Sequence, residues 1–356
     1  MRPLVTVLLD TYNQERYIEQ ALLSVLEQDF PAHEMEILVV DDGSTDGTPE
    51  VVRKFAPRVR LLRKENGGQA SAFNAGFAES TGQIVSFLDG DDWFAPGKLT
   101  LVTNALEREP HASGIGHGYY EFSQNSNATR ICAPSEARFL TLSTPEAARD
   151  AFTGWMSLLT SSFTVRKKTL DRIFPLSERL FFCADAPIAL GSMVEGARLL
   201  NEPLCYYRVH SENLHAIQTQ QPLKIRRKLE IEEVMFQELE SVLIRLGAPR
   251  ESVAALLYPP WTATRRAKLS TFGGSRLDTL RTEMRLFHLE SKRPGAGYLL
   301  FKYLVMAPTT LLLPPRSFYK AREWYGRRNL GRIRERVFGT GKDTRQDRIN
   351  VQEHPR

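Results

Sequence analysis

The stretch Phe87-Leu88-Asp89-Gly90-Asp91-Asp92-Trp93 decides how this sequence of 356 residues is interpreted. It places three carboxylates directly after Ile84–Leu88, an apolar run with the length and composition of a buried strand. Carboxylates this close repel one another unless a cation lies among them, and Mg²⁺ or Mn²⁺ would supply that charge while also binding phosphates. Gly90 lets the backbone turn sharply and approach a ligand. The alternative interpretation is a solvated acidic turn.

The residues around this stretch alternate short apolar runs with segments of helical periodicity. Strands are predicted at Val5–Leu9, Glu36–Val40, Val59–Leu62 and Ile84–Leu88, and helices at 18–28, from Thr48 onward and at 69–80. Strands that alternate with helices form βαβ units around a parallel sheet. The predicted fold class is therefore α/β, a Rossmann-like, mostly parallel sheet flanked by helices, with a helical extension toward the C-terminus.

Three of the predicted strands end in polar clusters, Asp10-Thr11-Tyr12-Asn13, Asp41-Asp42-Gly43-Ser44 and Asp89-Gly90-Asp91-Asp92. Ligands of open parallel sheets bind outside the carboxyl ends of the strands, so we expect the three clusters to meet at one rim. Asp42 is placed to accept hydrogen bonds from a nucleobase or a ribose, and an Asx-turn is the competing role. A fourth cluster, Asn66-Gly67-Gly68-Gln69, precedes a helix and either meets an anion or forms a structural turn.

Together these motifs resemble those of glycosyltransferase family 2, in the same order and at similar spacing. The resemblance covers residues 4–215 and is carried by Val5–Asn13, Asp41–Asp46, Asn66–Gly68 with Asn74-Ala75-Gly76, and Leu88–Asp92. It implies a GT-A fold, a UDP-, GDP- or dTDP-sugar donor, a divalent metal ion (Mn²⁺ or Mg²⁺) and inversion at the anomeric carbon. Carried onto this sequence, it implies metal binding by Asp91 and nucleotide-sugar binding by Asp10, Thr11, Asp42, Asn66, Gly67, Asp89 and Gly90.

Two later motifs complete the implied site. Phe182-Cys183-Ala184-Asp185-Ala186-Pro187 resembles the family's acidic motif at a helix start, which makes Asp185 the candidate catalytic base for the acceptor hydroxyl. An N-cap is the competing role of Asp185. Tyr206-Tyr207-Arg208-Val209-His210 resembles the stretch that follows the base. Arg208 is therefore expected to neutralise phosphate charge, and His210 to bind the metal or the diphosphate.

Two positions depart from the family's pattern. Asp10 stands where the family commonly has proline or a small residue. A carboxylate there would change the base preference, or would be held by Arg16 or by a backbone amide, and the sequence leaves these roles open. Ala184 stands where the family often has a second acid beside the base.

The predicted domains are a catalytic domain at 1–215, a helical region at 216–345 and a disordered tail at 346–356. Breaks between the helices are predicted at Pro259-Pro260, Gly273-Gly274, Pro294 and Pro314-Pro315. The apolar segment Gly297–Leu313 is too short and too interrupted to span a bilayer, so core packing, a partner interface and an interfacial helix remain. Eight Lys or Arg against two Glu between Arg316 and Arg336 favour an anionic membrane surface as partner, with a solvated helix end as the alternative.

The predicted function is transfer of a sugar to a glycan or lipid-linked acceptor in cell-surface polysaccharide or glycolipid synthesis, with no nucleic-acid partner. Three widely spaced cysteines and the lack of a signal-peptide pattern predict a cytoplasmic location, peripheral on the inner face of the membrane. One alternative is a nucleotidyltransferase, which would need a Gly-rich basic phosphate loop that Asp10–Gln14 does not form. The other is a non-catalytic sugar or lipid-carrier binding protein on the same scaffold.

Overall fold

A computed structural model describes residues 4–123, 126, 128–155, 158–210, 222–291 and 306–327. The strands are β1 (Val5–Thr11), β2 (Met35–Asp41), β3 (Arg60–Arg63), β4 (Ile84–Asp89), β5 (Trp93–Phe94), β6 (Gly114–Ser123), β7 (Ala128–Cys132), β8 (Arg138–Leu140), β9 (Phe163–Arg166) and β10 (Ala197–Val209). The helices are α1 (Ile18–Leu26), α2 (Thr48–Arg53), α3 (Gln69–Glu79), α4 (Lys98–Arg108), α5 (Pro145–Trp155), α6 (Lys167–Ile173), α7 (Asp185–Glu195), α8 (Pro222–Arg245), α9 (Arg250–Phe272), α10 (Arg276–Ser291) and α12 (Pro315–Arg327). Two short 3₁₀ turns are η1 (Ala32–Glu34) and η2 (Thr160–Ser162).

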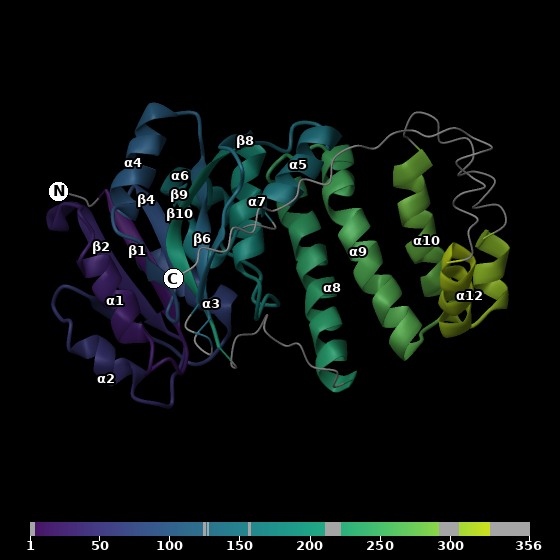
Figure 1. Ribbon diagram of the computed structural model, residues 1–356, viewed down its shortest axis with the longest axis horizontal. Helices are drawn as coiled ribbons and strands as arrows, with labels where there is room; N and C mark the ends of the chain where they lie inside the picture. The colour runs from purple at the N-terminus through teal and green to yellow at the C-terminus, as the bar shows by residue number, and fades with distance from the viewer. Residues whose placement is uncertain are drawn as a thin grey trace. The chain divides into compact units, whose positions relative to one another are not determined.

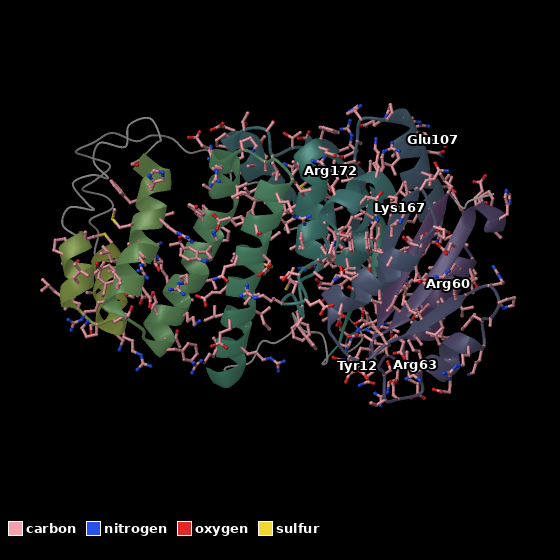
Figure 2. All side chains as sticks on the ribbon, turned by 180° about the vertical axis from the view of Figure 1, so that it is seen from behind. Tyr12, Arg60, Arg63, Glu107, Lys167 and Arg172 are labelled. Atoms are coloured by element: carbon pink, nitrogen blue, oxygen red, sulfur yellow. The ribbon has the colours of Figure 1, made fainter. Side chains whose placement is uncertain are left out.

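The first half of the sheet is the predicted parallel array. The strand order is β3-β2-β1-β4-β9-β6-β10-β5, and β3, β2, β1 and β4 pair in parallel (Figure 1). Their carboxyl ends lie at one end of the sheet, where Figure 2 labels Tyr12 and Arg63, while Glu107 of α4 lies at the other end. The intervening helices α1, α2 and α3 confirm the predicted βαβ units.

The second half of the sheet is mixed. β9 lies antiparallel between β4 and β6, whereas β6 and β10 pair in parallel. β5 adds an antiparallel strand to β10, with Trp93 opposite Tyr206. β7 and β8 pair antiparallel with β6 and β10. The prediction of a mostly parallel sheet therefore holds for β1 to β4. Among the later strands, most pairs are antiparallel.

Helices cover both faces of the parallel strands. On one face, α1, α2 and α4 enclose a core whose buried residues include Val5, Val7, Leu9, Ile18, Leu22, Val52, Leu99 and Val102. On the other face, α3 packs close to β1 and β2. A Cβ on Gly76 would lie 2.3 Å from Leu8 Cδ1 and 2.8 Å from Val40 Cγ2, so the absence of a side chain permits this approach.

The described residues form two compact units, one within 4–210 with 237–253, and one of 222–236 with 254–291 and 306–327. The predicted boundary at 215 and the tail at 346–356 lie outside the described residues, so this division stays a prediction. In the second unit, the carboxylate of Glu283 is only 2% exposed and binds Arg266 in two contacts of 2.8 and 2.6 Å. Arg322 and Tyr319 of α12 also bind this carboxylate, which ties α12 to α10.

One predicted helix break is wrong. α9 runs without interruption through Pro259 and Pro260, although two prolines remove two backbone donors from the interior of the helix. The helix is kept by packing, because Leu257 and Thr262 on either side of the prolines are buried. The breaks at Gly273-Gly274 and Pro314-Pro315 are confirmed, since α9 ends at Phe272 before Gly273 and α12 begins at Pro315. The predicted break at Pro294 lies outside the described residues.

Candidate active site

The three strand-end clusters meet at one rim, as predicted. Asp10 on β1 is the cross-strand neighbour of Asp89 on β4, and Thr11 is the neighbour of Asp41 on β2. The amide of Asp42 donates to the carbonyl of Thr11 at 2.9 Å. Residues that are up to 79 positions apart in the sequence, Asp10 and Asp89, therefore lie side by side, because β1 is between β2 and β4.

The carboxyl groups of Asp10 and Asp89 interact at the ends of β1 and β4, where the two residues are cross-strand neighbours. Burial raises the pKa of Asp10 to about 7 and that of Asp89 well above its usual range, and the charge of Asp10 raises the pKa of Asp89 further. One oxygen of Asp10, Oδ1, is buried without a hydrogen-bond partner among the described residues. Asp89, rather than Arg16, is thus the side-chain partner that the described contacts give to Asp10.

Asp92 holds the acid loop, the residues 90–92, in place. Its side chain is 1% exposed, and its two oxygens accept the amide of Arg208 at 3.0 Å and the hydroxyl of Ser161 at 2.7 Å. Ser161 Oγ also accepts the amide of Asp89 at 3.1 Å. Burial raises the pKa of Asp92 well above its usual range, and the nearby charge of Asp91 adds to this. Asp92 has the contacts of a turn-stabilising residue.

Asp91 points to the residue that follows β10. Its Oδ2 lies 3.1 Å from Nε2 of His210, with side chains 15% and 8% exposed. His210 also packs against the ring of Tyr17, with the ring centroids 4.8 Å apart. No set of three or more His, Cys, Asp or Glu side chains with the geometry of a metal site occurs among the residues that the structure describes. A metal held here would have two protein ligands, one carboxylate and one imidazole.

Gly90 is closely surrounded. A Cβ at this position would lie 2.1 Å from Oε1 of Gln14 and 2.9 Å from Oγ1 of Thr11. Thr11 is buried, and its hydroxyl donates to the same Gln14 oxygen at 2.9 Å. The Gly90 amide donates to the carbonyl of Asp10 at 3.0 Å, which fastens the acid loop to β1.

Asp42 is also largely occupied by contacts within the protein. Its carboxylate, 4% exposed, accepts Lys64 Nζ at 2.8 Å and the amides of Gly67 and Gly68 at 3.0 and 2.7 Å. Asn66 precedes these glycines with an exposed side chain. Asp42 therefore shapes the Gly-rich loop at the edge of the rim.

The turn expected at Asp42 is made by Asp41. Oδ1 of Asp41 accepts the amide of Ser44 at 2.9 Å, and Oδ2 accepts Nε of Arg63 at 2.7 Å. Asp41 is fully buried. The Asx-turn that stood as the competing role of Asp42 is therefore wrong, because Asp41 accepts the turn amide.

The guanidinium of Arg208 binds the main chain of the acid loop. Its Nε donates to the carbonyl of Asp91 at 2.9 Å, and an Nη atom donates to Gln20 Oε1 at 2.5 Å. The same group lies 4.5 Å from the ring centroid of Trp93 and 4.9 Å from that of Tyr17. Arg208 is only 6% exposed. These contacts fix the main chain of the loop, and phosphate binding by Arg208 stays a prediction.

Asp185 is the first residue of α7, and Ala184 is its N-cap residue. The competing role of Asp185 as the N-cap is therefore wrong, although the carboxylate lies in the first turn, where a negative charge is favoured. Cys183 has φ = 60°, a left-handed conformation that is uncommon for a side chain of this type. The chain thus turns sharply into α7 and presents Asp185 at the start of the helix.

Three comparisons place the chain among known proteins. The family model described as glycosyl transferase family 2 matches residues 6–174. An uncharacterized glycosyltransferase of Nostoc sp. is 30% identical over 253 residues, which cover 68% of this chain and 76% of that protein. The chain belongs to glycosyltransferase family 2. A second uncharacterized family relative, EpsJ of Bacillus subtilis, is 28% identical over 226 residues, or 61% of this chain and 64% of that protein.

The solved structure of Staphylococcus aureus TarS, residues 1–349, matches this glycosyltransferase with a TM-score of 0.62 at 19% identity. The match covers 91% of this chain and 92% of that one, so the two share the GT-A fold. TarS is named a poly(ribitol-phosphate) β-N-acetylglucosaminyltransferase, and 114 of its residues, a fifth of its length, are 37% identical to this chain. The sequence expectations of family, α/β fold class and glycosyltransferase activity are thereby confirmed.

Several residues that shape this glycosyltransferase site were not found by motif. Ser161 lies in the short turn η2, far along the chain from the acid loop, yet it contacts both Asp89 and Asp92. Gln69, directly after the two glycines, lies 3.3 Å from Oδ1 of Asp89 through its Nε2 atom. The position of Gln69 beside a glycine pair was a signal that could have been used, whereas nothing in the local sequence distinguishes Ser161.

A lysine lies fully buried beneath the acid loop. Nζ of Lys98, at the start of α4, donates to the carbonyl of Ser161 at 2.7 Å and lies 3.5 Å from the ring centroid of Phe94. Burial lowers the pKa of Lys98 to about 7. His117 is buried nearby, with Nδ1 bonded to the carbonyl of Gly118 at 2.7 Å. The buried polar groups of Lys98 and His117 form a layer that supports the acid loop.

Proposed function

We propose that this glycosyltransferase moves a sugar with inversion from a nucleotide-sugar donor to an acceptor hydroxyl, in a single displacement at the carboxyl-end rim of the sheet. The observation that carries the proposal is the convergence of Asp10, Asp89 and Asp42 at that rim, with Asp91 and His210 facing each other beside it. Such a rim is where nucleotides bind in open α/β sheets. The donor diphosphate would lie against the acid loop.

The Asp91 and His210 side chains fit a divalent ion. A carboxylate oxygen and an imidazole nitrogen within 3.1 Å of each other already converge on one point, and both are mostly shielded from solvent. Mn²⁺ accepts this mixed ligand pair, and Mg²⁺ or Mn²⁺ commonly takes its remaining ligands from phosphates and water. A bound ion would neutralise the charge of the leaving nucleoside diphosphate.

The remaining candidate residues divide between the nucleoside and the acceptor. Asp42 and Thr11, at the ends of β2 and β1, would line the nucleoside pocket together with the Gly67 loop that Asp42 holds. Asp10 and Asp89 would lie near the ribose, and one buried oxygen of Asp10 has no hydrogen-bond partner among the described residues. Asp185, at the start of α7, would take the proton of the acceptor hydroxyl as it attacks.

The acceptor we propose is a glycan or lipid-linked glycan of the cell surface. The named relatives support this class, because they include TarS and the chondroitin synthase of Pasteurella multocida, which is 33% identical over 150 residues. Those residues are 37% of this chain and 15% of the synthase. Family membership also disfavours the nucleotidyltransferase alternative.

The proposal is tested by a donor screen. Release of nucleoside diphosphate would be measured for UDP-, GDP- and dTDP-sugars in the presence of Mn²⁺, Mg²⁺ or EDTA. We expect one nucleotide class to turn over, and only with a divalent ion. Full turnover in EDTA would contradict the metal assignment. Donor binding without any turnover would instead favour the non-catalytic alternative.

We also infer that the protein acts in the cytoplasm, on the inner face of a membrane. None of the helices in the described part of the chain is long and apolar enough to cross a bilayer. Leu311, Leu312 and Leu313 are nevertheless 48%, 71% and 36% exposed, and Arg316 and Lys320 on α12 are exposed as well. Apolar insertion and cationic attraction reinforce each other at an anionic surface. Residues 292–305, which include most of the apolar segment, lie outside the described residues.

Sedimentation with vesicles tests this second inference. We expect the full chain to sediment with phosphatidylglycerol-containing vesicles and much less with phosphatidylcholine alone. Leu311→Glu with Leu312→Glu should abolish sedimentation, whereas Leu277→Glu, at a site of equal exposure on α10, should not. Equal behaviour of the two variants would refute the proposed contact.

A further inference from the structure

The side chain of Gln69 joins the acid loop to the start of α7. Its Oε1 accepts the amide of Ala184 at 3.0 Å. Its Nε2 lies 3.3 Å from Oδ1 of Asp89 and 3.4 Å from Oγ1 of Thr160. The Gln69 side chain therefore connects Asp89, at the end of β4, with Ala184, the residue immediately before Asp185.

The position of Gln69 is fixed by the Gly-rich loop that Asp42 binds. It is the first residue of α3 and follows Gly68, whose φ is 83°. The amides of Gly67 and Gly68 both donate to Asp42. A Cβ on Gly68 would lie 2.6 Å from the ring of Phe181, so only glycine allows this loop to approach that closely.

The segment before Asp185 is fastened to α3 at two places. The main-chain amides of Gln69 and Ala70 donate to the carbonyls of Phe181 and Leu180 at 3.0 and 3.4 Å. The Gln69 side chain then holds the amide of Ala184, after the left-handed turn at Cys183. The main-chain hydrogen bonds hold Leu180 and Phe181 against the start of α3. The hydrogen bond from the Ala184 amide to the Gln69 side chain fixes where α7 begins.

We propose that Gln69 is a positioning residue that sets Asp185 at its working distance from the donor. This inference rests on the proposed role of Asp185 as the base. The physical reason is that reacting groups must be held to within a fraction of an ångström, and a displacement of about 1 Å can lower the rate about 100-fold. Without the Oε1 contact, the amide of Ala184 loses its anchor and the first turn of α7 can shift.

The chain offers a matched control on the same helix. Asn74 binds the main chain of Leu176 in both directions, at 2.9 Å from its Nδ2 to the carbonyl and 2.7 Å from the amide to its Oδ1. Asn74 thus ties α3 to the same connection, but nine residues before Asp185. Gln69→Met and Asn74→Leu remove comparable amide contacts with little change in side-chain volume.

The test measures kcat for nucleoside diphosphate release, donor KM and folding by circular dichroism, with UDP-N-acetylglucosamine, GDP-mannose and dTDP-rhamnose as probes. For Gln69→Met we expect kcat to fall about 10- to 100-fold with donor KM within about three-fold. For Asn74→Leu we expect kcat within about three-fold of the parent chain. Equal losses of kcat in the two variants, or an unchanged kcat in Gln69→Met, would overturn the proposal.

A second variant separates the two ends of Gln69. Gln69→Glu keeps an oxygen that can accept the Ala184 amide but places a negative charge beside Asp89. We expect kcat near that of the parent chain and a raised donor KM, and a large loss of kcat would count against the proposal even if Gln69→Met does not fold. Asp185→Asn distinguishes the two levels of inference: if it retains full turnover, the base assignment itself is wrong, whatever Gln69 does.

Discussion

Nε2 of His210 lies 3.1 Å from Oδ2 of Asp91, although 119 positions separate the two residues in the sequence. The contact exists because the Arg208 amide binds Asp92, which places the end of β10 against the acid loop. His210 follows directly after β10 and so arrives over Asp91. Two motifs that were found independently in the sequence therefore form one candidate site.

This pairing predicts a shared effect of the two residues on metal dependence. Asp91→Asn and His210→Gln should each lower Mn²⁺-supported nucleoside diphosphate release by about 100-fold or more, because each removes a ligand from the ion that stabilises the leaving group. Both should raise the Mn²⁺ concentration needed for half-maximal rate. Asp171→Asn, an exposed acid on α6, serves as the control and should have no effect. A metal dependence equal to that of the parent chain would rule out the assignment.

Asp185→Asn should separate chemistry from donor binding. The amide is nearly isosteric but cannot accept the acceptor's proton, so we expect kcat to fall about 100- to 10,000-fold while the donor Kd stays within about three-fold. Rapid-quench measurement of the chemical step and calorimetric donor binding would check this. Weakened donor binding with an intact kcat would move Asp185 from the acceptor side to the donor side.

The N-terminal half of the fold could be predicted because its signals are local. Runs such as Ile84–Leu88 carry the period and length of buried strands, and the helices α1, α2 and α3 between the first four strands give parallel crossovers. The antiparallel insertion of β9 between β4 and β6 depends on long-range pairing and leaves no local periodicity.

The residues of the candidate site could likewise be predicted only where their signals are local. Motif residues such as Asp89 and Asp91 were found because the chemistry of a clustered carboxylate is visible in the sequence. The direction in which a side chain points was not visible, and Arg208 therefore was assigned to phosphate although its guanidinium binds the carbonyl of Asp91. Ser161 was missed because a serine in the short turn Thr160–Ser162 has no distinguishing pattern.

Arg208→Lys tests whether Arg208 mainly holds the main chain of the acid loop or mainly binds phosphate. Lysine keeps the charge but cannot reach Asp91 and Gln20 together or stack between two rings. We expect the free energy of unfolding to fall by about 1.5–3 kcal/mol, the range for lost hydrogen bonds to a charged group. Arg179→Lys, at an exposed pair with Glu238, should change it by less than about 1 kcal/mol. Urea denaturation measures both. An unchanged stability with a raised donor KM would favour direct phosphate binding.

Lys98 predicts how stability depends on pH. Its pKa is about 7 in the folded protein because of burial, against a usual value of 10.5. Between these values the unfolded chain binds one proton more than the folded protein, so the free energy of unfolding rises with pH across this window. Below pH 7 both states are protonated, and the full cost of burying the charge opposes folding.

Substitution of Lys98 by methionine removes this dependence. The difference in the free energy of unfolding between the parent chain and Lys98→Met should shift in favour of the parent as pH rises from 7 to 10, by at most about 1.4 kcal/mol per pH unit. Urea denaturation at each pH measures it, with the exposed Lys168→Met as the control. A difference that stays constant from pH 7 to 10 would mean that Lys98 keeps its ordinary pKa, and that water or a charged partner reaches the layer beneath the acid loop.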